Sequence, residues 1–341
     1  MKRVGILTGG GDCPGLNAAI RAIVRRSTQH RFTSIGILEG WRGLVKGLTR
    51  ELPPESVSGI LHVGGTILRT SRTNPIKMPD GVAKVEENFQ KLSLDALVAI
   101  GGEDTLGVAN ALHKRGLPVV GVPKTIDNDL GGTDLTFGFD TAVSIVTEAI
   151  DRLHSTAESH NRVMVVEVMG RHAGWIATYS GIAGGADVIL VPEFPVVLET
   201  VCSHIISRHV KGKNFSIVVV AEGATLGDDT VSEGKGTDAF GHRQLGGIGT
   251  LVAAEIERRT GFETRVTTLG HVQRGGTPTA FDRVLASRYG VFAADLVKDE
   301  KFGKMAALRG NEIVAVDLEE AVAELRTLDR RFFELAEVFF G

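Results

Sequence analysis

The chain has 341 residues, a length typical of two domains of about 150 residues each. Its 38 lysines and arginines and 41 aspartates and glutamates leave a net charge of −3, which argues against a general nucleic-acid-binding protein with a basic surface. Two cysteines are too few for a disulfide framework, and no apolar run approaches the ~18 residues of a membrane helix. No signal-peptide pattern precedes the first apolar run. We therefore expect a reducing, cytoplasmic setting with no nucleic-acid or membrane partner.

Short apolar runs alternate with amphipathic stretches along the chain. Runs that are apolar throughout are typical of strands covered on both faces. The predicted strands are residues 4–8, 34–38, 97–100, 119–122, 163–168, 188–191, 217–221, 266–269 and 313–316. The clearest predicted helices are residues 16–26, 141–154, 250–259 and 319–326. This alternation predicts an α/β fold, with parallel sheets and helices on both sides of them.

Two crossings between domains are expected, one near residues 131–136 and a return near residues 247–250. The expected division places residues 1–137 and about 250–300 in one domain, and residues 138–249 and about 301–341 in the other. A polar, glycine-rich stretch at residues 228–242 is expected to form a surface loop. The aromatic residues expected in the core or in a subunit contact are Trp41, Trp175, Phe332, Phe333, Phe339 and Phe340.

The carboxyl ends of the predicted strands carry small residues followed by charged ones. In open α/β sheets, ligands bind just beyond these ends. A purely structural turn needs one glycine or asparagine and no charge. The segments concerned are residues 9–12 (GGGD), 101–105 (GGEDT), 123–129 (PKTIDND), 169–172 (MGRH), 222–223 (EG) and 270–276 (GHVQRGG). Together they predict a ligand site.

The three glycines at residues 9–11 join a predicted strand to a predicted helix, so backbone amides and a helix N-terminus can face an anion. The run is not a dinucleotide fingerprint, because Pro14 stands where the third glycine belongs. It is not a Walker A loop either, because no Gly-Lys-Ser/Thr follows. Phosphate binding and a tight turn that needs glycine for backbone reasons both remain open.

Asp127 and Asp129 are two carboxylates beside Lys124, a pattern that suits proton abstraction or metal binding. The alternative is an Asx turn that caps a helix, and the residues alone leave both interpretations open. Arg171 and Arg274 lie in glycine-rich strand-end loops, where a guanidinium can clamp a phosphate.

Three further residues are ambiguous by themselves. Arg162 and Arg265, taken singly, are typical of solvated surface side chains. His271 could act as a base, although a structural or substrate-binding role is favoured. The ten histidines show no metal-binding spacing.

Taken together, these loops resemble those of the 6-phosphofructokinase family over essentially the whole chain. The matching segments are residues 9–21 (GGGDCPGLNAAIR), 64–72 (GGTILRTSR), 101–105 (GGEDT), 123–129 (PKTIDND), 169–174 (MGRHAG), 221–223 (AEG) and 269–276 (LGHVQRGG). The resemblance implies two αβα Rossmann-like domains of the phosphofructokinase fold, with the active site in the cleft between them. One domain would bind the phosphoryl donor and Mg²⁺, and the other fructose 6-phosphate.

The resemblance also implies roles for individual residues. Asp127 would take the proton from the sugar 1-hydroxyl, Asp129 would support charge or metal, and Glu103 would hold Mg²⁺ where the family usually has aspartate. Residues implied to bind the donor or stabilise the transferred group are Gly10, Gly11, Arg72, Asp104, Lys124 and Thr125. Residues implied to bind the sugar phosphate are Thr125, Ile126, Asp127, Met169, Gly170, Arg171, Glu222, His271, Val272, Gln273 and Arg274.

Arg162 and Arg265 match residues that reach the 6-phosphate from a neighbouring subunit. The resemblance therefore implies a homodimer or homotetramer with shared active sites. Residues that resemble an allosteric effector pocket are Arg21, Arg25, His154, Asp187, Lys211 and Lys213. The alternative for these six is that they are inherited or solvated charges.

Asp104 and Lys124 bear on the donor, because ATP-using members generally carry glycine at the first position and often at the second. A carboxylate at residue 104 would meet the α-phosphate of ATP. Two like charges ~4 Å apart cost about 4 kcal/mol at an effective dielectric constant of ~20, roughly three decades in binding. Pyrophosphate ends before that point, and Lys124 offers it a cation.

The sequence therefore predicts a pyrophosphate-dependent phosphofructokinase that reversibly forms fructose 1,6-bisphosphate and phosphate. One alternative is an ATP-dependent 6-phosphofructokinase, to which some relatives with a lysine at residue 124 belong. Another is a non-catalytic sugar-phosphate sensor, which the retained acids Glu103, Asp127 and Asp129 disfavour.

Overall fold

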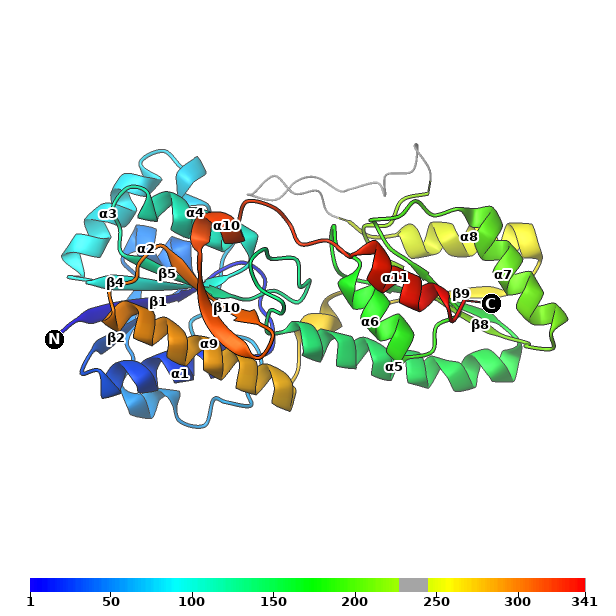
Figure 1. Cartoon of the computed structure of the whole chain (residues 1–341), viewed down its shortest axis with the longest axis horizontal. Coiled ribbons are helices and arrows are strands. Elements are labelled where there is room, and N and C mark those ends of the chain that lie inside the picture. Colours follow the sequence, from blue (N-terminus) through cyan, green and yellow to red (C-terminus); the bar gives the residue numbers. More distant parts are fainter. Residues whose placement is uncertain (227–244, 341) are drawn as a thin grey trace.

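The computed structural model describes residues 1–226 and 245–340, and the expected surface loop at residues 228–242 lies outside them. The described chain forms two sheets, each with helices on both faces, which follow one another along the long axis of the molecule (Figure 1). We call the part built on the seven-stranded sheet the large-sheet region and the part built on the four-stranded sheet the small-sheet region. The expected α/β class with two three-layer units is confirmed.

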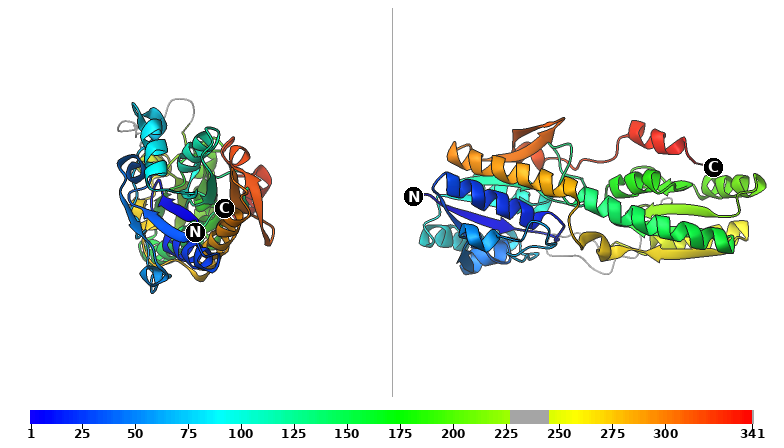
Figure 2. Two further views of the ribbon diagram at one scale, coloured as in Figure 1. Left: turned by 90° about the vertical axis from the view of Figure 1, so that its left-hand side faces the viewer. Right: turned by 90° about the horizontal axis from the view of Figure 1, so that it is seen from below.

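The large-sheet region has the strand order β11-β10-β5-β4-β1-β2-β3. Its strands are β1 (Arg3–Thr8), β2 (Thr33–Ile37), β3 (Thr49–Glu51), β4 (Ala96–Gly101), β5 (Val119–Pro123), β10 (Lys304–Arg309) and β11 (Glu312–Asp317). Its helices are α1 (Leu16–Gln29), α2 (Trp41–Lys46), α3 (Gly81–Lys91), α4 (Glu103–His113), α9 (Ala280–Lys298) and α10 (Leu318–Ala321), with 3-10 turns η1 (Pro54–Val57) and η2 (Pro75–Lys77). Helices α1 and α9 lie side by side on one face (Figure 2), and α2, α3, α4 and α10 cover the other.

The small-sheet region has the strand order β7-β8-β6-β9, with all pairs parallel. Its strands are β6 (Val163–Val168), β7 (Val188–Leu190), β8 (Ser216–Ala221) and β9 (Thr264–Thr268). Its helices are α5 (Phe139–His160), α6 (Trp175–Ala183), α7 (Leu198–Val210), α8 (Ile248–Thr260) and α11 (Arg330–Glu337), with the 3-10 turn η3 (Gly270–Arg274). Helices α5 and α6 cover one face and α7 and α8 the other.

Strand β6 shows why an uninterrupted apolar run becomes a central strand. All six of its side chains are buried, because consecutive residues of a strand point to opposite faces. Val163 and Val165 join the core beneath α7 and α8, whereas Met164, Val166 and Val168 join the core beneath α5 and α6. A strand covered on both faces therefore gains hydrophobic burial from each of its apolar residues. Glu167, the one charged residue of β6, is also buried and accepts from the amides of Gly247 and Gly249.

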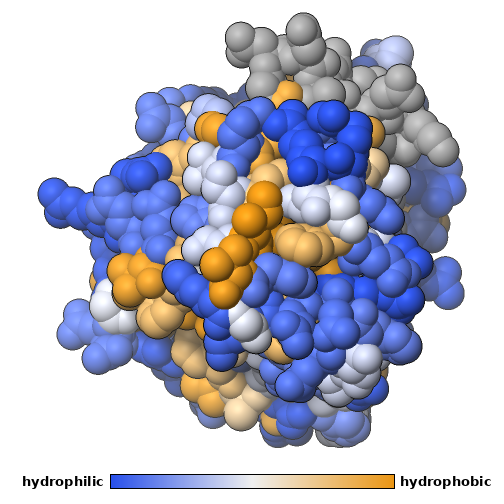
Figure 3. Space-filling view, turned by 90° about the vertical axis from the view of Figure 1, so that its right-hand side faces the viewer, coloured by the Kyte–Doolittle hydropathy of each residue, from blue (hydrophilic) through white to orange (hydrophobic). Residues whose placement is uncertain are grey.

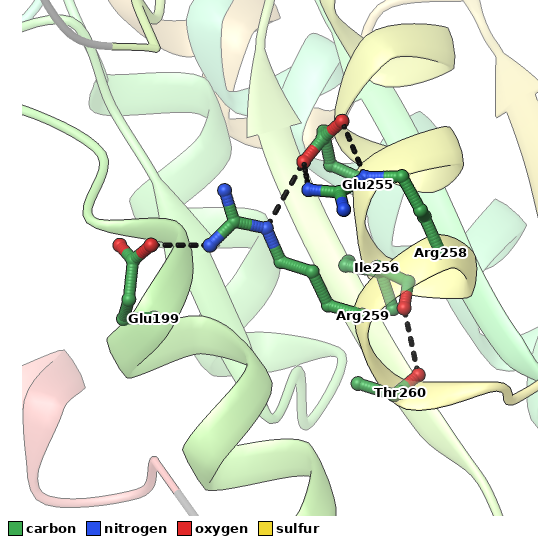
Figure 4. A network of polar contacts seen from close by, with 6 residues as sticks. All are labelled: Glu199, Glu255, Ile256, Arg258, Arg259 and Thr260. Atoms are coloured by element: carbon green, nitrogen blue, oxygen red, sulfur yellow. Dashed lines mark hydrogen bonds and ion pairs between the residues drawn. The ribbon is translucent and has the colours of Figure 1, made fainter.

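Helices α7 and α8 are also joined by a surface network (Figure 4). Arg259 of α8 donates to Glu199 of α7 and to Glu255 one turn earlier, and Arg258 donates to Glu255 at 2.7 Å. These two hydrogen-bonding arginines lower the pKa of Glu255 to about 2. Exposed pairs contribute little to stability singly, so the packing of α7 on α8 depends mainly on the apolar core beneath them.

The expected division of the chain into domains was wrong in two places. Residues 250–268 do not return to the first domain, because α8 and β9 belong to the small-sheet region. Residues 301–317 do not belong to the second domain, because β10 pairs with β5 and β11 pairs with β10. The chain crosses before α5, again between η3 and α9, and a third time between α10 and α11 (Figure 1).

Strands β3 and β10 were missed, and β3 and β11 are antiparallel where only parallel pairs were expected. Strand β3 has the polar sequence TRE, which carries no apolar signal. Strand β10 has the sequence KMAALR, in which alanine has low strand propensity. Both antiparallel strands lie at an edge of the sheet, where no helical crossover is needed.

The predicted helix at residues 319–326 shortens to the single turn of α10, and the following residues run as an irregular segment to α11. The other three predicted helices are confirmed as α1, α5 and α8, although α5 extends to His160. Beyond α10, Arg326 and Leu328 make hydrogen bonds with the small-sheet region, which a continued helix would not allow their backbone groups to do, as described below.

The aromatic residues divide between core and surface. Trp41, Trp175 and Phe333 are buried, and Phe332 and Phe340 pack partly buried against the core. Figure 3 views the end of the molecule formed by the small-sheet region, where apolar side chains lie among polar ones. The exposed large apolar side chains of α7 and of the C-terminal segment include Ile206, Val210, Leu335, Val338 and Phe339. A subunit contact through this tail stays a prediction.

Candidate active site

One cleft lies where the strand-end loops of the two regions face each other. Its lining combines loops that follow β1, β4 and β5 with loops that follow β6 and β9. The lining residues are Gly10, Gly11, Asp12, Arg72, Gly102, Glu103, Asp104, Thr105, Lys124, Thr125, Ile126, Asp127, Asp129, Arg171 and Arg274. All of the predicted donor-binding and catalytic residues are therefore brought together.

The glycine-rich loop at residues 9–11 is shaped by close contacts. A Cβ at Gly9 would lie 2.5 Å from Oγ1 of Thr105, and one at Gly101 would lie 2.3 Å from Cβ of Thr105. Glycine at both positions thus lets the first turn of α4 approach β1 and β4. A Cβ at Gly11 would meet the guanidinium of Arg274, which places a cation from the small-sheet region directly against this loop.

Lys124 ends the extended run of β5 and is 4% exposed. Its Nζ donates to the carbonyl of Gly11 at 2.5 Å, and its backbone amide donates to Gly101 at 3.0 Å. Burial lowers the pKa of Lys124. The lysine thus presents a desolvated amine beside the glycine-rich loop, where an anionic group would be drawn to it.

The carboxylates Glu103 and Asp104 occupy the first turn of α4, whose N-cap is Gly102. Asp104 is the second helical residue, so it is not at the capping position. A carboxylate in the first turn is favoured by the positive end of the helix dipole. Both residues line the same cleft as Lys124 and Asp127.

The turn at residues 127–129, here called the catalytic turn, is fixed by its own side chains. Asn128 adopts a left-handed conformation with φ of 53°, and its Oδ1 accepts from the amide of Thr136 at 3.0 Å. Thr136 in turn donates its hydroxyl to the carbonyl of Thr125 at 2.7 Å. Asn128 thus bridges to a residue eight positions further along the chain and does not form an Asx turn, and both aspartates line the cleft.

Asp127 is 6% exposed, and its Oδ1 has no hydrogen-bond partner among the residues that the structure describes. Its charge acts on two neighbours. Burial first, and the charge of Asp127 second, raise the pKa of Asp129 to about 7. The same two causes, in the same order, raise the pKa of Glu222 to about 7. Two acids with raised pKa values therefore lie near Asp127, an arrangement that is common in acid–base sites.

The loop after β6 contributes Arg171, whose backbone has φ of 50°. Its amide donates to Oε1 of Glu222 at 3.3 Å, and Gly223 lies so close to the Arg171 carbonyl that a Cβ would approach it to 1.8 Å. The Met169 amide donates to Oε1 of Gln273 at 3.2 Å. The loops after β6, β8 and β9 are thus held together as one unit.

The predicted sugar-binding residues do not all line the cleft. Gln273 is fully buried and bridges Met169 to the carbonyl of Gly270, so the structure gives it a supporting position. His271 and Val272 are exposed on η3 outside the cleft lining. The remaining predicted residues outside the lining are Arg162, Met169, Gly170, Glu222 and Arg265.

Arg162 and Arg265 lie at the opposite end of the small sheet. Arg162 immediately precedes β6, and Arg265 is in the second position of β9, whereas the cleft loops follow the other ends of these strands. A six-residue strand is about 20 Å long, so neither side chain belongs to the cleft of its own chain. Both guanidiniums pair with Glu263, Arg162 at 2.8 Å.

The six possible effector residues fall into two separate groups. Arg21 and Arg25 lie on α1 of the large-sheet region, and the other four lie in the small-sheet region. Asp187 is buried, pairs with Arg208 at 2.9 Å and accepts from the amide of Ile217 at 2.8 Å. These contacts give Asp187 a structural role within the chain. A working effector site stays a prediction.

Three cleft residues were missed: Asp12, Gly102 and Thr105. Asp12 lies in the segment of residues 9–12, and Gly102 and Thr105 lie in the segment of residues 101–105, both of which the sequence predicts to be part of the site. Their places in these segments could have identified them as cleft residues. Among the described residues no cluster of three or more histidines, cysteines or acids forms a metal site, and no helix is long and apolar enough to span a bilayer.

Comparisons with known proteins agree with this geometry. A family model described as phosphofructokinase matches residues 3–297. A pyrophosphate–fructose 6-phosphate 1-phosphotransferase of Streptomyces coelicolor is 58% identical, covering 99% of this chain and 100% of the relative. ATP-dependent 6-phosphofructokinase 3 of the same organism is 52% identical, covering 97% of this chain and 98% of the relative.

A solved structure gives the same result. Pichia pastoris phosphofructokinase in the T-state matches with a TM-score of 0.85 and 34% identity over 99% of this chain. The chain spans only 36% of that protein's length. On the sequence motifs, the two sheets, the family model over residues 3–297 and the curated relatives that match over nearly their whole length, the chain belongs to the phosphofructokinase family.

Proposed function

We propose that this protein transfers a phosphoryl group from pyrophosphate to the 1-hydroxyl of fructose 6-phosphate. The products would be fructose 1,6-bisphosphate and phosphate. The observation that carries this choice of donor is that Asp104 and Lys124 line one cleft that also contains Asp127. The name of the relative that is 58% identical supports the same donor, although an ATP-dependent relative at 52% is nearly as similar.

The proposed step is an in-line displacement. Asp127 accepts the proton of the sugar 1-hydroxyl, whose oxygen forms a bond to phosphorus while the bridging P–O bond of pyrophosphate breaks. The buried, unpartnered Oδ1 of Asp127 supports its role as the base. Lys124, Arg72 and the amides of the glycine-rich loop neutralise the oxygens of the donor, which is the main requirement of phosphoryl transfer.

Mg²⁺ fits the residues at this site. The cation is usually held by one or two carboxylates together with substrate phosphates and water, so a cage of three protein ligands is not needed. Glu103 is the proposed carboxylate, and Asp129 is proposed to support it, because burial first and the charge of Asp127 second raise the pKa of Asp129, and a bound cation would offset both. When bound, Mg²⁺ would supply charge neutralisation to the phosphate oxygens.

The sugar phosphate is proposed to lie against the small-sheet region. Arg171 and Arg274 line the cleft from that side, and Glu222 and Met169 lie in the loops that support them. Arg162 and Arg265, at the far end of the sheet, are proposed to serve the 6-phosphate site of a neighbouring subunit in a homodimer or homotetramer. A cytoplasmic, reducing setting is supported by two buried free cysteines.

Steady-state kinetics with purified protein test this function. The protein is supplied with Mg²⁺ and fructose 6-phosphate, and then with pyrophosphate, ATP or no donor. We expect kcat/KM for pyrophosphate to exceed that for ATP by at least about tenfold, since a like-charge contact separates the two donors by decades. We also expect pyrophosphate formation from fructose 1,6-bisphosphate and phosphate at a comparable rate. A preference for ATP, or no detectable reverse reaction at saturation, contradicts the proposal.

A further inference from the structure

The third crossing between the regions runs through residues 322–329, which we call the strap. It leaves α10 on the large-sheet region and reaches α11 on the small-sheet region along one side of the molecule (Figure 1). The sequence predicts a helix over much of this stretch, yet the chain is irregular here. Its backbone groups are therefore available for partners outside a helix.

The strap contacts the catalytic turn through one residue. The amide of Arg326 donates to the carbonyl of Asp129 at 2.8 Å, and its Nη1 donates to the carbonyl of Asn128 at 3.3 Å. Gly131 lies against the start of the strap, because a Cβ there would approach the carbonyl of Glu324 to 3.0 Å. Two consecutive carbonyls of the turn that carries both acids are thus oriented by Arg326.

The same residue contacts the first turn of α6. Its guanidinium lies 4.2 Å from the ring centroid of Trp175, and its carbonyl accepts from Nε1 of Trp175 at 3.0 Å. Two residues later, Leu328 donates to Oε1 of Glu193, which also accepts from the amide of Gly174 at 2.9 Å. The strap is therefore fixed to the helix that follows the Arg171 loop.

We propose that Arg326 is a positioning residue that couples the catalytic turn of one region to the sugar-phosphate loop of the other. Two points favour coupling over simple linkage. The backbone and the side chain of Arg326 both contact each region: they bond to Asp129 and Asn128 on one side and contact Trp175 on the other. The guanidinium is partly buried. Arg326 does not line the cleft, so it acts through Asp129 and Asn128 rather than on substrate.

This inference rests on the proposed function for its kinetic test, and the chain offers an independent optical one. The chain has two tryptophans, Trp41 and Trp175. Trp41 is buried in the core between the large sheet and the face covered by α2, α3, α4 and α10. In a Trp41→Phe background, Trp175 reports the contact with Arg326. Pyrophosphate with Mg²⁺ is the probe, because it is proposed to bind on the large-sheet side.

We expect Arg326→Ala to lower kcat by about tenfold or more while KM for fructose 6-phosphate stays within about threefold, because no substrate contact is lost. The change in Trp175 emission on adding pyrophosphate and Mg²⁺ should disappear, although calorimetry still shows binding. Arg326→Lys keeps a cation over Trp175 and loses the second donor, so we expect intermediate values. It serves as the test variant if Arg326→Ala unfolds. Arg331→Ala, an exposed arginine on α11, is the matched control.

The outcomes separate the two proposals. If wild type uses ATP instead, the proposed donor is wrong, and the same comparison with ATP still decides the role of Arg326. If wild type turns over neither donor, the Trp175 response to pyrophosphate and Mg²⁺, with binding measured by calorimetry, still decides it. A kcat within twofold of wild type in Arg326→Ala and Arg326→Lys, or an unchanged Trp175 response in both, overturns the coupling.

Discussion

At the scale of single residues, the proposed choice of donor rests on Asp104. Asp104 is the second residue of α4, two positions after the N-cap. This position distinguishes two explanations of its carboxylate, which are helix capping and exclusion of ATP. A capping carboxylate would only stabilise the helix, and the cap position belongs to Gly102. Capping therefore does not explain Asp104, and exclusion of the α-phosphate of ATP is our proposal for a negative charge that lines this cleft.

We predict that Asp104→Gly raises kcat/KM for ATP and lowers it for pyrophosphate. The substitution removes a like-charge contact and opens space, while Lys124 loses its acidic neighbour on the donor. The ratio of kcat/KM for the two donors, measured in wild type and variant, is the readout. Asp95→Gly at the opposite end of β4 would change stability without touching the cleft, so it controls for added flexibility. An unchanged donor ratio would show that Asp104 does not select the donor.

The second residue-scale prediction concerns the base. Asp127→Ala should lower kcat by at least about 10²-fold, the low end for loss of a general base, because the sugar hydroxyl then has no proton acceptor at hand. KM for fructose 6-phosphate should change little, because Arg171 and Arg274 remain. Single-turnover kinetics of the purified variant provide the measurement. A near-normal kcat would remove Asp127 from the mechanism.

At the scale of elements, the first turns of α5 and α9 meet where two crossings lie together. Oδ2 of Asp282 in α9 accepts from the amide of Thr141 at 2.8 Å and from its hydroxyl at 2.5 Å. Thr279, the N-cap of α9, donates to Asp140 of α5 at 2.6 Å. Each helix start therefore supplies hydrogen-bonding groups to the other, and this joint connects the two regions.

We predict a pH-dependent cost at this joint. Burial raises the pKa of Asp282 from an ordinary 3.8 to about 6. The folded protein therefore holds this proton to higher pH than the unfolded chain, so the Asp282 contribution to stability falls as pH rises from about 4 to about 6. Asp282→Asn keeps an acceptor for Thr141 and removes the titration.

Urea unfolding of wild type and Asp282→Asn at several pH values between 5 and 7.5 measures this effect. Relative to the variant, wild type should lose about 1 kcal/mol of unfolding free energy as pH rises across this range. Most of that loss should be complete near pH 6.5. A difference between the two proteins that is constant with pH would show that Asp282 is ionised throughout.

At the scale of the whole molecule, the position of Arg162 and Arg265 bears on assembly. They lie about one strand length from the cleft of their own chain and are gathered by Glu263 at the end of the small sheet. A second copy whose cleft met this end would complete its 6-phosphate site with these arginines. The proposed shared active sites would give these two arginines, which pair with Glu263 within their own chain, a role in the cleft of a second copy.

We predict that inactive Asp127→Ala chains mixed with inactive Arg162→Ala chains regain part of the activity after dissociation and reassembly. Each hybrid assembly should contain some sites with an intact base and an intact donated arginine. Mixing Asp127→Ala with a chain that carries both substitutions is the control and should regain none. A fully active monomer in sedimentation experiments would contradict this assembly.

Much of the site was readable in the sequence because its signals are local. A glycine run, two acids beside a lysine and an arginine after a buried strand each occupy adjacent residues, and parallel strands end at the same edge of a sheet. Gly11, Lys124 and Asp127 were therefore found together where the sequence predicted them. Apolar runs such as β6 likewise determined the buried strands.

Only the tertiary structure decided which region the C-terminal segments β9 and β10 join. It also decided the contacts of residues such as Gln273 and Arg326. Whether β9 pairs with β6 or β10 with β5 depends on hydrogen bonds between segments that are more than 90 residues apart, and no local pattern encodes a partner. The sequence predicts that Gln273 binds the substrate, whereas in the structure its side-chain amide bridges Met169 and Gly270. Arg326 belongs to no sequence motif, because its contacts are with Asn128, Asp129 and Trp175, which are more than 150 residues away in the sequence.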